Sequence, residues 1–184
     1  MQSRRTFLQT VGVVGAVGTL GVGVTAARPP RDGDTIVDVA IAANTEGPFA
    51  GELDTLIAAV LAAELDGPLS GNRQLTVFAP TDDTFAAVGL TVDQDGVLQV
   101  APATADLLAD AGLTLADVLL YHVLPGRRKA QSILPVSGVP TLFGARVEVD
   151  GTTLNDGQAS IIATDIPASN GIVHVIEGDS VLLP

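Results

Sequence analysis

The fold is decided by the stretch TVFAPTDDTF, residues 76–85. Its first half is β-branched and aromatic, which predicts a buried strand that ends at Pro80. Its second half is polar and acidic, so we expect Thr81 to cap a short helix that continues through Phe85. Phe78, Pro80, Thr81 and Phe85 are therefore predicted to have structural roles at a tight strand-to-helix corner.

Helical periodicity surrounds this corner on both sides. Apolar residues recur at the spacing of an amphipathic helix, and Gly, Pro and Asn interrupt them. We predict helices over 35–44, 53–65, 103–111 and 114–123, and a small hairpin over 90–100. Gly67-Pro68 is expected to stop the second helix.

After Pro125-Gly126 the apolar period changes from that of a helix to that of a strand. Short strands separated by Gly, Asn and Asp turns are predicted over 133–134, 141–143, 146–149, 152–154, 159–163, 172–176 and 181–183. Helices first and strands second predict an α+β domain.

Composition supports one folded domain and excludes several classes of function. Of 184 residues, 47% are hydrophobic and only 16% are charged, which is enough apolar surface for a core. The absence of Cys excludes disulfides, thiolate zinc sites and Cys nucleophiles. The net charge of −12 argues against nucleic acid as a partner, because phosphate binding needs a basic face.

The N-terminus resembles an export signal. Arg4-Arg5 precedes Phe7-Leu8 and an uncharged stretch from Thr10 to Ala27. Paired arginines in this position predict a twin-arginine-type signal peptide over residues 1–27, a type that exports folded proteins. The alternative is a retained transmembrane helix, since 18 residues is its lower limit. Five glycines in the stretch favour removal. The protein would be membrane-bound only if the signal were retained as an anchor.

Without residues 1–27 the chain keeps 7 Lys and Arg against 21 Asp and Glu, a net charge of −14. Residues 28–34 are rich in Pro and charge and are predicted to be an extended linker, with the domain over 35–184. Lys129 is the only lysine of the chain. This acidic surface is typical of halophilic proteins, which remain soluble in molar salt, although an ordinary acidic secreted protein is the alternative.

The chain offers little for catalysis or metal binding. His122 and His174 are its only histidines, and no Gly-x-Ser-x-Gly elbow surrounds a serine. No further nitrogen or sulfur ligands cluster with them. We therefore expect no enzyme activity, no metal site and no cofactor.

Three blocks in order resemble the fasciclin-like domain family. They are 76–85, the Tyr-His block 120–126, and the closing block 170–176 with 181–184. The resemblance covers 35–184 and implies a β-wedge or sandwich with several packed helices. It also implies an extracellular adhesion or matrix-binding module and not an enzyme. The chain departs from the family pattern at Glu177–Ser180, an apparent two-residue insertion before the final segment.

The resemblance also suggests roles for individual residues. Relatives use the Tyr-His region for receptor binding, which implies a binding role for Tyr121, His122 and Leu124. Asn170, Gly171 and His174 belong to the closing block, and Asn170-Gly171 suits a turn with positive φ before a core strand.

The only basic cluster beyond residues 1–34 is Arg127-Arg128-Lys129. It follows the predicted helix that carries Tyr121, so it either caps that helix or attracts an anionic polysaccharide or acidic surface protein. Our leading hypothesis is a secreted module that adheres to a cell-surface or matrix protein or polysaccharide by non-covalent contacts. The alternative is a carrier of an apolar small molecule such as a carotenoid, because some family members bind carotenoids.

Overall fold

The computed structural model describes residues 33–184. The predicted signal peptide, residues 1–27, lies outside the described residues, and so does most of the predicted linker, residues 28–34. The elements from the start of the described chain to the fourth strand are α1 (Ile36–Thr45), α2 (Asp54–Ala62), α3 (Asp66–Leu69), β1 (Leu75–Pro80), α4 (Asp82–Ala87), β2 (Leu90–Val92), β3 (Leu98–Val100), α5 (Pro102–Asp110), α6 (Leu115–Tyr121) and β4 (Val123–Pro125). The remaining elements are α7 (Ala130–Ile133), β5 (Gly138–Pro140), β6 (Arg146–Asp150), β7 (Thr153–Leu154), the 3-10 helix η1 (Asn155–Gly157), β8 (Ala159–Ala168) and β9 (Gly171–Glu177).

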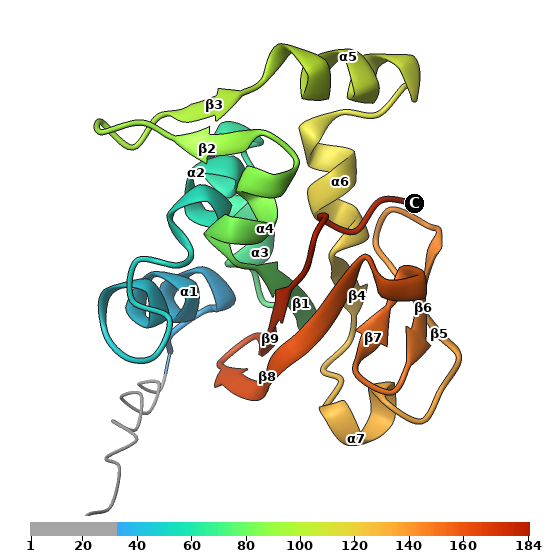
Figure 1. Cartoon of the computed structure of the whole chain (residues 1–184). Coiled ribbons are helices and arrows are strands. Elements are labelled where there is room, and N and C mark those ends of the chain that lie inside the picture. The colour runs from blue at the N-terminus through green and yellow to red at the C-terminus, as the bar shows by residue number, and fades with distance from the viewer. Residues whose placement is uncertain (1–32) are drawn as a thin grey trace, which may run out of the picture.

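Seven strands form one sheet in the order β4-β1-β9-β8-β7-β6-β5. β1 lies parallel to β9 over its whole length, and the other neighbours are antiparallel. Figure 1 shows α1, α2 and α4 on one side of β1 and β9, with β5, β6 and β7 on the other. The predicted α+β class, a sheet with several packed helices, is confirmed.

The outer edge of β4 is covered by the chain that follows β5. The Leu142 amide donates to the Val123 carbonyl of β4 at 2.7 Å, and the Phe143 amide donates to the Leu120 carbonyl of the preceding helix α6 at 3.3 Å. Both β4 and β5 end in proline, which has no N–H to donate. The sheet therefore curls so that its first strand meets the chain beyond its last.

Two hydrophobic cores lie on opposite faces of β1. Leu75, Val77 and Ala79 point into the core formed with α1, α2 and α6, whereas Phe78 points into the core under β6, β7 and β8. This alternation is what the two-residue period of a strand requires when both faces are covered. Strand β1 therefore connects the two hydrophobic cores.

The strand-to-helix corner forms as predicted, but Thr81 acts differently. Its backbone is extended at the N-cap of α4, yet its hydroxyl bonds to the hydroxyl of Thr84 at 3.1 Å and not to a helix amide. Asp82 accepts instead from the amide of Thr55 at 2.8 Å, which ties the corner to α2. The corner is thus held by tertiary contacts and not by the predicted side-chain cap.

The strand predictions at three places are corrected by the structure. Residues 133–134 are not a strand, because Ile133 ends the buried helical turn α7. Short apolar runs fit either element. The 141–143 run is a turn after β5. Residues 181–183 are largely buried but pair with no strand of the described chain.

The helix predictions err at two ends. α2 ends at Ala62, and Gly67-Pro68 lies inside α3, where proline is tolerated because a first turn needs no amide donor. α6 ends at Tyr121, and Val123–Pro125 forms strand β4.

Residues 91–113 form an arm across the top of Figure 1, which contacts α2 and α4 through β2 and β3. The predicted hairpin is confirmed as β2 and β3, and the predicted helix as α5. No residue of α5 is buried, and Leu107 and Val97 are 56% and 55% exposed.

Candidate functional site

The Tyr121 side chain is buried at the end of α6. Its hydroxyl donates to the Arg146 carbonyl at 2.8 Å and accepts from the side-chain Nδ2 of Asn155 at 3.0 Å. Its ring meets Phe143 edge-on, with ring centroids 6.2 Å apart. Burial raises the pKa of Tyr121, so the phenol stays protonated as a donor. All these contacts are internal, which gives Tyr121 a structural role.

His122 is equally buried and joins α6 to the last residues of the chain. Its Nδ1 lies 2.8 Å from the Val118 carbonyl, and its Nε2 accepts from the Leu182 amide at 3.1 Å. These partners require a neutral ring protonated on Nδ1. Burial lowers the pKa of His122 to about 4. The ring therefore fixes Leu182, and the side chains of Gln158 and Asn155 fix Leu183, so this segment is held without a strand partner.

His174 lies in β9 and is buried beside Phe78, with ring centroids 6.0 Å apart. Its Nε2 is 3.0 Å from the Arg128 carbonyl, and its Nδ1 accepts from the Asp165 amide at 3.2 Å. Burial lowers the pKa of His174 as well. Both histidines thus serve main-chain groups and neither faces an open site.

The other motif residues are also internal. Phe78, Pro80, Phe85 and Leu124 are buried and contribute to the two cores or the corner. With Tyr121 and His122, the burial of Leu124 removes the whole predicted Tyr-His contact from the surface of this fold.

Asn170 and Gly171 do not form the predicted turn with positive φ, because neither has a φ in that region. Asn170 is a buried connector: its side-chain oxygen accepts from the Ile36 amide at 2.8 Å, and its nitrogen donates to the Leu69 carbonyl at 2.6 Å. Gly171 is required by close packing, since a Cβ there would lie 2.1 Å from the Leu75 carbonyl oxygen. The sequence signal was real, but its cause is proximity and not backbone conformation.

Residues 126–130, which we call the basic loop, connect β4 to α7. Arg127 and Lys129 are exposed and Arg128 is half-buried. Because β4 separates this loop from α6, the three cations do not cap the Tyr-His helix, and that interpretation is wrong. Arg128 reaches instead to the Pro125 carbonyl through Nε at 3.3 Å.

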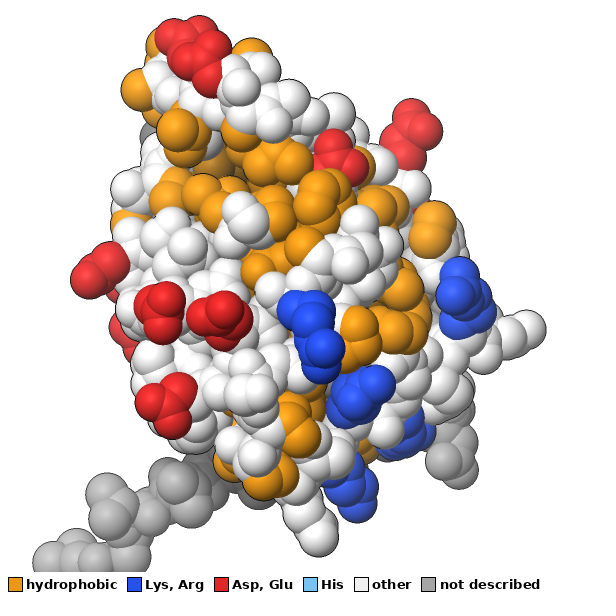
Figure 2. Space-filling model, turned by 90° about the vertical axis from the view of Figure 1, so that its right-hand side faces the viewer, with side chains coloured by type: hydrophobic (Ala, Val, Ile, Leu, Met, Phe, Trp, Pro, Cys, Tyr) orange, Lys and Arg blue, Asp and Glu red, His pale blue; other side chains and the backbone are white. Residues whose placement is uncertain are grey.

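The cations of the described chain gather in one region, which we call the basic face. Its members are Arg73, Arg127, Arg128, Lys129 and Arg146. Arg73 lies beside the basic loop because Gly126 bonds to Gln74, and Arg146 borders Tyr121. Figure 2 shows Lys and Arg side chains gathered on one side of this face of the molecule, with Asp and Glu on the other side and at the top.

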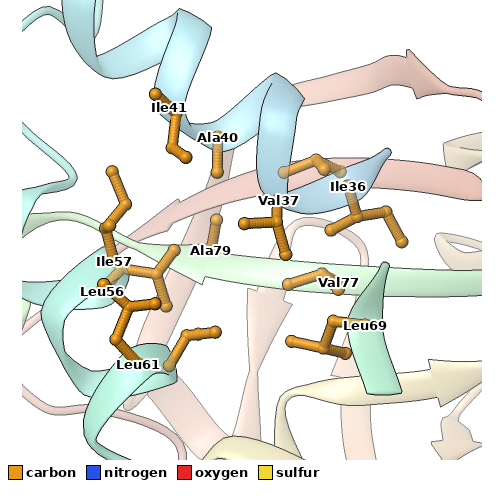
Figure 3. Close-up of a pocket in the computed structure, with 12 residues that line it drawn as sticks. Ile36, Val37, Ala40, Ile41, Leu56, Ile57, Leu61, Leu69, Val77 and Ala79 are labelled. Carbon is orange, nitrogen blue, oxygen red and sulfur yellow. The ribbon is translucent and has the colours of Figure 1, made fainter. Parts of the chain in front are cut away.

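An apolar cleft lies between α1, α2 and β1. Figure 3 shows Ile36, Val37 and Ile41 of α1 opposite Leu56, Ile57 and Leu61 of α2, with Val77 and Ala79 at its floor. Its volume is about 60 Å³. Ile41 and Leu61 are 43% and 56% exposed at its rim. The sequence marks these residues only as helix faces and does not reveal the cleft.

The fasciclin domain family model matches residues 51–184. The chain belongs to the fasciclin domain family.

Curated relatives of this fasciclin domain include bacterial proteins of greater length. It is 37% identical over 112 residues to the protein sll1483 of Synechocystis, covering 59% of this chain and 54% of that protein. It is 32% identical over 113 residues to the immunogenic protein MPB70 of Mycobacterium bovis, covering 60% and 50%. The chain thus spans about half the length of these two relatives.

A solved structure shares the fold. It is a domain pair from the insect cell adhesion molecule fasciclin I, with a TM-score of 0.58 and 17% identity over 82% of this chain and 51% of that one. At this identity the likeness concerns the fold alone.

Within residues 33–184 of this fasciclin domain, no three His, Asp or Glu side chains are grouped so that they could hold a metal ion. No helix in the same residues is long and apolar enough to cross a membrane. Every buried side-chain nitrogen and oxygen of the described part has a hydrogen-bond partner. The exposed cations of the basic face are therefore the candidate binding groups on the described surface.

Three residues with clear roles were missed in the sequence. Thr76, Asn155 and Asp165 each bond to segments distant in the chain, Thr76 to the basic loop and Asn155 to Tyr121 and the Leu183 carbonyl. Asn155 and Asp165 have positive φ values of 46° and 61°. An Asn-Asp-Gly run at 155–157 was a usable turn signal, but nothing in the sequence pointed to their partners.

Proposed function

We propose that this fasciclin domain is a secreted adhesion module that binds an acidic cell-surface or matrix component through the basic face. The predicted signal peptide, residues 1–27 with its twin arginines, supports export. Membership of a family that includes an insect cell adhesion molecule supports the adhesion class. We assign binding to the basic face because the positive charges of the described chain are gathered there.

The described residues contain 20 Asp and Glu against 5 Lys and Arg, so most of the surface repels anions. Residues 74–126 contain no Lys or Arg at all. Attraction between an acidic partner and this domain is therefore confined to the basic face. Arg127 and Lys129 are its exposed members in the basic loop. Both can bind a carboxylate or sulfate directly from solvent.

Binding to immobilised polygalacturonate and polyglutamate tests this proposal at a series of salt concentrations. The double variant Arg127→Gln/Lys129→Gln should bind at least one of these polymers roughly tenfold more weakly than the wild type. Binding of the wild type should weaken as salt rises, because exposed charges are screened.

Asp106→Asn/Asp110→Asn, on the exposed face of α5, provides the control. It changes the net charge by the same amount in the opposite direction, so a purely global charge effect would strengthen binding comparably. Wild-type protein that binds neither polymer, or a basic-loop double variant that binds as well as the wild type, would contradict the proposal.

The cleft between α1 and α2 supports a second candidate, a carrier of an apolar small molecule. All twelve residues that line it are apolar. Its volume of about 60 Å³ is well below the roughly 300 Å³ of a typical ligand pocket, so a pigment would have to part the two helices. Visible absorption and native mass spectrometry of protein purified from its host decide this candidate, and a colourless protein of the bare mature mass removes it.

A further inference from the structure

We infer that Thr76, His174 and Asp165 are positioning residues that hold the basic loop in the conformation that meets its partner. This inference rests on the proposed function of the basic face. It concerns a set of side chains that do not touch the partner and act through the loop they support.

Each of the three side chains holds a different part of the basic loop. The Thr76 hydroxyl donates to the Gly126 carbonyl at 2.7 Å and accepts from the Arg128 amide at 2.8 Å. His174 bonds to the Arg128 carbonyl through Nε2 at 3.0 Å. Asp165 accepts from the Ala130 amide at 2.9 Å. Both ends of the loop and its central residue are therefore fixed by side chains from β1, β9 and β8.

The three residues also act as one unit. The Asp165 amide donates to Nδ1 of His174, which leaves Nε2 of the neutral ring as the donor toward Arg128. Thr76 and His174 are fully buried on adjacent, parallel strands. The loop is thus braced from the interior of the sheet by Thr76 and His174, and at the surface by the exposed Asp165.

The backbone of β8 is distorted where it supplies this brace. The register of β8 against β9 shifts between Ala163 and Ile166, and Asp165 in that interval has a φ of 61°. A bulge re-aims a side chain, and a left-handed conformation at a non-glycine residue carries a conformational cost. The distortion directs the Asp165 carboxylate to Ala130 and its amide to His174.

Fixing the loop matters because Arg and Lys side chains lose conformational freedom when they bind. A backbone already held in place reduces the entropy lost on association. Asp165 sharpens the argument, since a carboxylate beside the basic loop opposes an anionic partner electrostatically. A role in positioning predicts a benefit from its hydrogen bond that outweighs this repulsion.

The Asp165 position separates the two effects. Asp165→Asn removes the charge but keeps an oxygen that can accept from Ala130, and asparagine tolerates the left-handed backbone. Asp165→Ala removes both the charge and the acceptor. We expect Asn to bind polygalacturonate or polyglutamate as well as or better than the wild type, and Ala to bind roughly fivefold more weakly. If both variants strengthen binding, charge alone governs the loop and the inference is overturned.

The Thr76 position gives the second test. Thr76→Val should weaken binding about five- to tenfold, and Thr76→Ser, which restores the hydroxyl, should recover it. Thr84→Val is the matched control: Thr84 is also fully buried and makes two hydrogen bonds, but far from the basic loop. Hydrogen exchange of the Arg128 amide should be faster in Thr76→Val only.

The outcomes distinguish this inference from the proposed function. If the basic-loop double variant loses binding but Thr76→Val binds like Thr84→Val, the brace has no part in binding and only this inference fails. If the wild type binds neither polymer, the proposed function fails and this inference with it. Exchange at Arg128 that is unchanged in Thr76→Val would show that the brace does not hold the loop.

Discussion

The basic loop and the arm are both surface segments, and the protein holds them in opposite ways. The basic loop is short and is bonded to polar side chains from three strands, of which Thr76 and His174 are buried and Asp165 is exposed. The arm is much longer, and its helix α5 buries no residue. The difference shows that the polar residues in two of the family blocks work from inside: Thr76 of the first block and His174 of the last support a surface they do not join.

The largest loss of stability is expected from a substitution at Gly171, in the sheet that supports the basic loop. A Cβ at Gly171 would lie 2.1 Å from the Leu75 carbonyl oxygen and 2.6 Å from Ile36 Cδ1, so β9 and β1 would have to separate. Gly171→Ala should lower the free energy of unfolding by about 4 kcal/mol or more, measured by urea denaturation. Gly112→Ala in the arm meets no atom within 4 Å and only strains a φ of 65°, so it should cost about 1 kcal/mol. Equal costs would contradict the packing argument.

The second largest effect is expected from acid, which should lower the free energy of unfolding through His122. Its pKa is about 6.5 in the unfolded chain and about 4 in the fold, so on acidification the unfolded state takes up the proton first. The contribution to stability is therefore complete above pH 6.5 and decreases by about 3 kcal/mol as the pH falls to 4. The lowered pKa of His174 acts in the same direction.

Urea midpoints across this pH range measure the effect, with His122→Gln as the comparison. The variant should be less stable at neutral pH but should lose less stability on acidification than the wild type. Parallel pH profiles would show that His122 is not responsible. The arm has no histidine, so hydrogen exchange in α5 should respond to acid only as far as the whole domain does.

The smallest effect is expected in the arm. Leu107 is 56% exposed and touches the body only at its inner edge, so Leu107→Ala should cost under about 1 kcal/mol in urea denaturation. Leu124→Ala, at a fully buried site, serves as the reference and should cost about 3 kcal/mol. A Leu107 variant as unstable as the Leu124 variant would mean that the arm is an integral part of the core.

Local features of the fold were predictable from the sequence, and its long-range contacts were not. The corner at residues 76–85 was predictable because a strand, a proline and a polar helix start are adjacent in the chain. Ile133-Leu134 was wrongly predicted as a strand. Two apolar residues are too few to distinguish the period of a strand from that of a helix. Residues 181–183 were predicted to be a strand, but the segment pairs with no strand of the described chain. Side chains bond to its backbone instead: His122 to Leu182, and Gln158 and Asn155 to Leu183.

The candidate site followed the same pattern. The cluster Arg127-Arg128-Lys129 was visible as composition, and its exposed members remain the proposed contact. Tyr121 and His122 were visible as a motif, but only their tertiary partners revealed that they are internal. The link from Asp165 to Ala130 joins residues 35 apart, and no local periodicity encodes it.

The covered edge of β4 affects how closely copies of this domain can lie without aggregating. An open edge strand is a template on which strands of neighbouring molecules add, and this leads to aggregation. Here the Leu142 amide already occupies the outer side of that edge, and Pro125 and Pro140 withhold donors at the ends of β4 and β5. Many copies could therefore be displayed side by side at high local density without β4 seeding sheet growth between them.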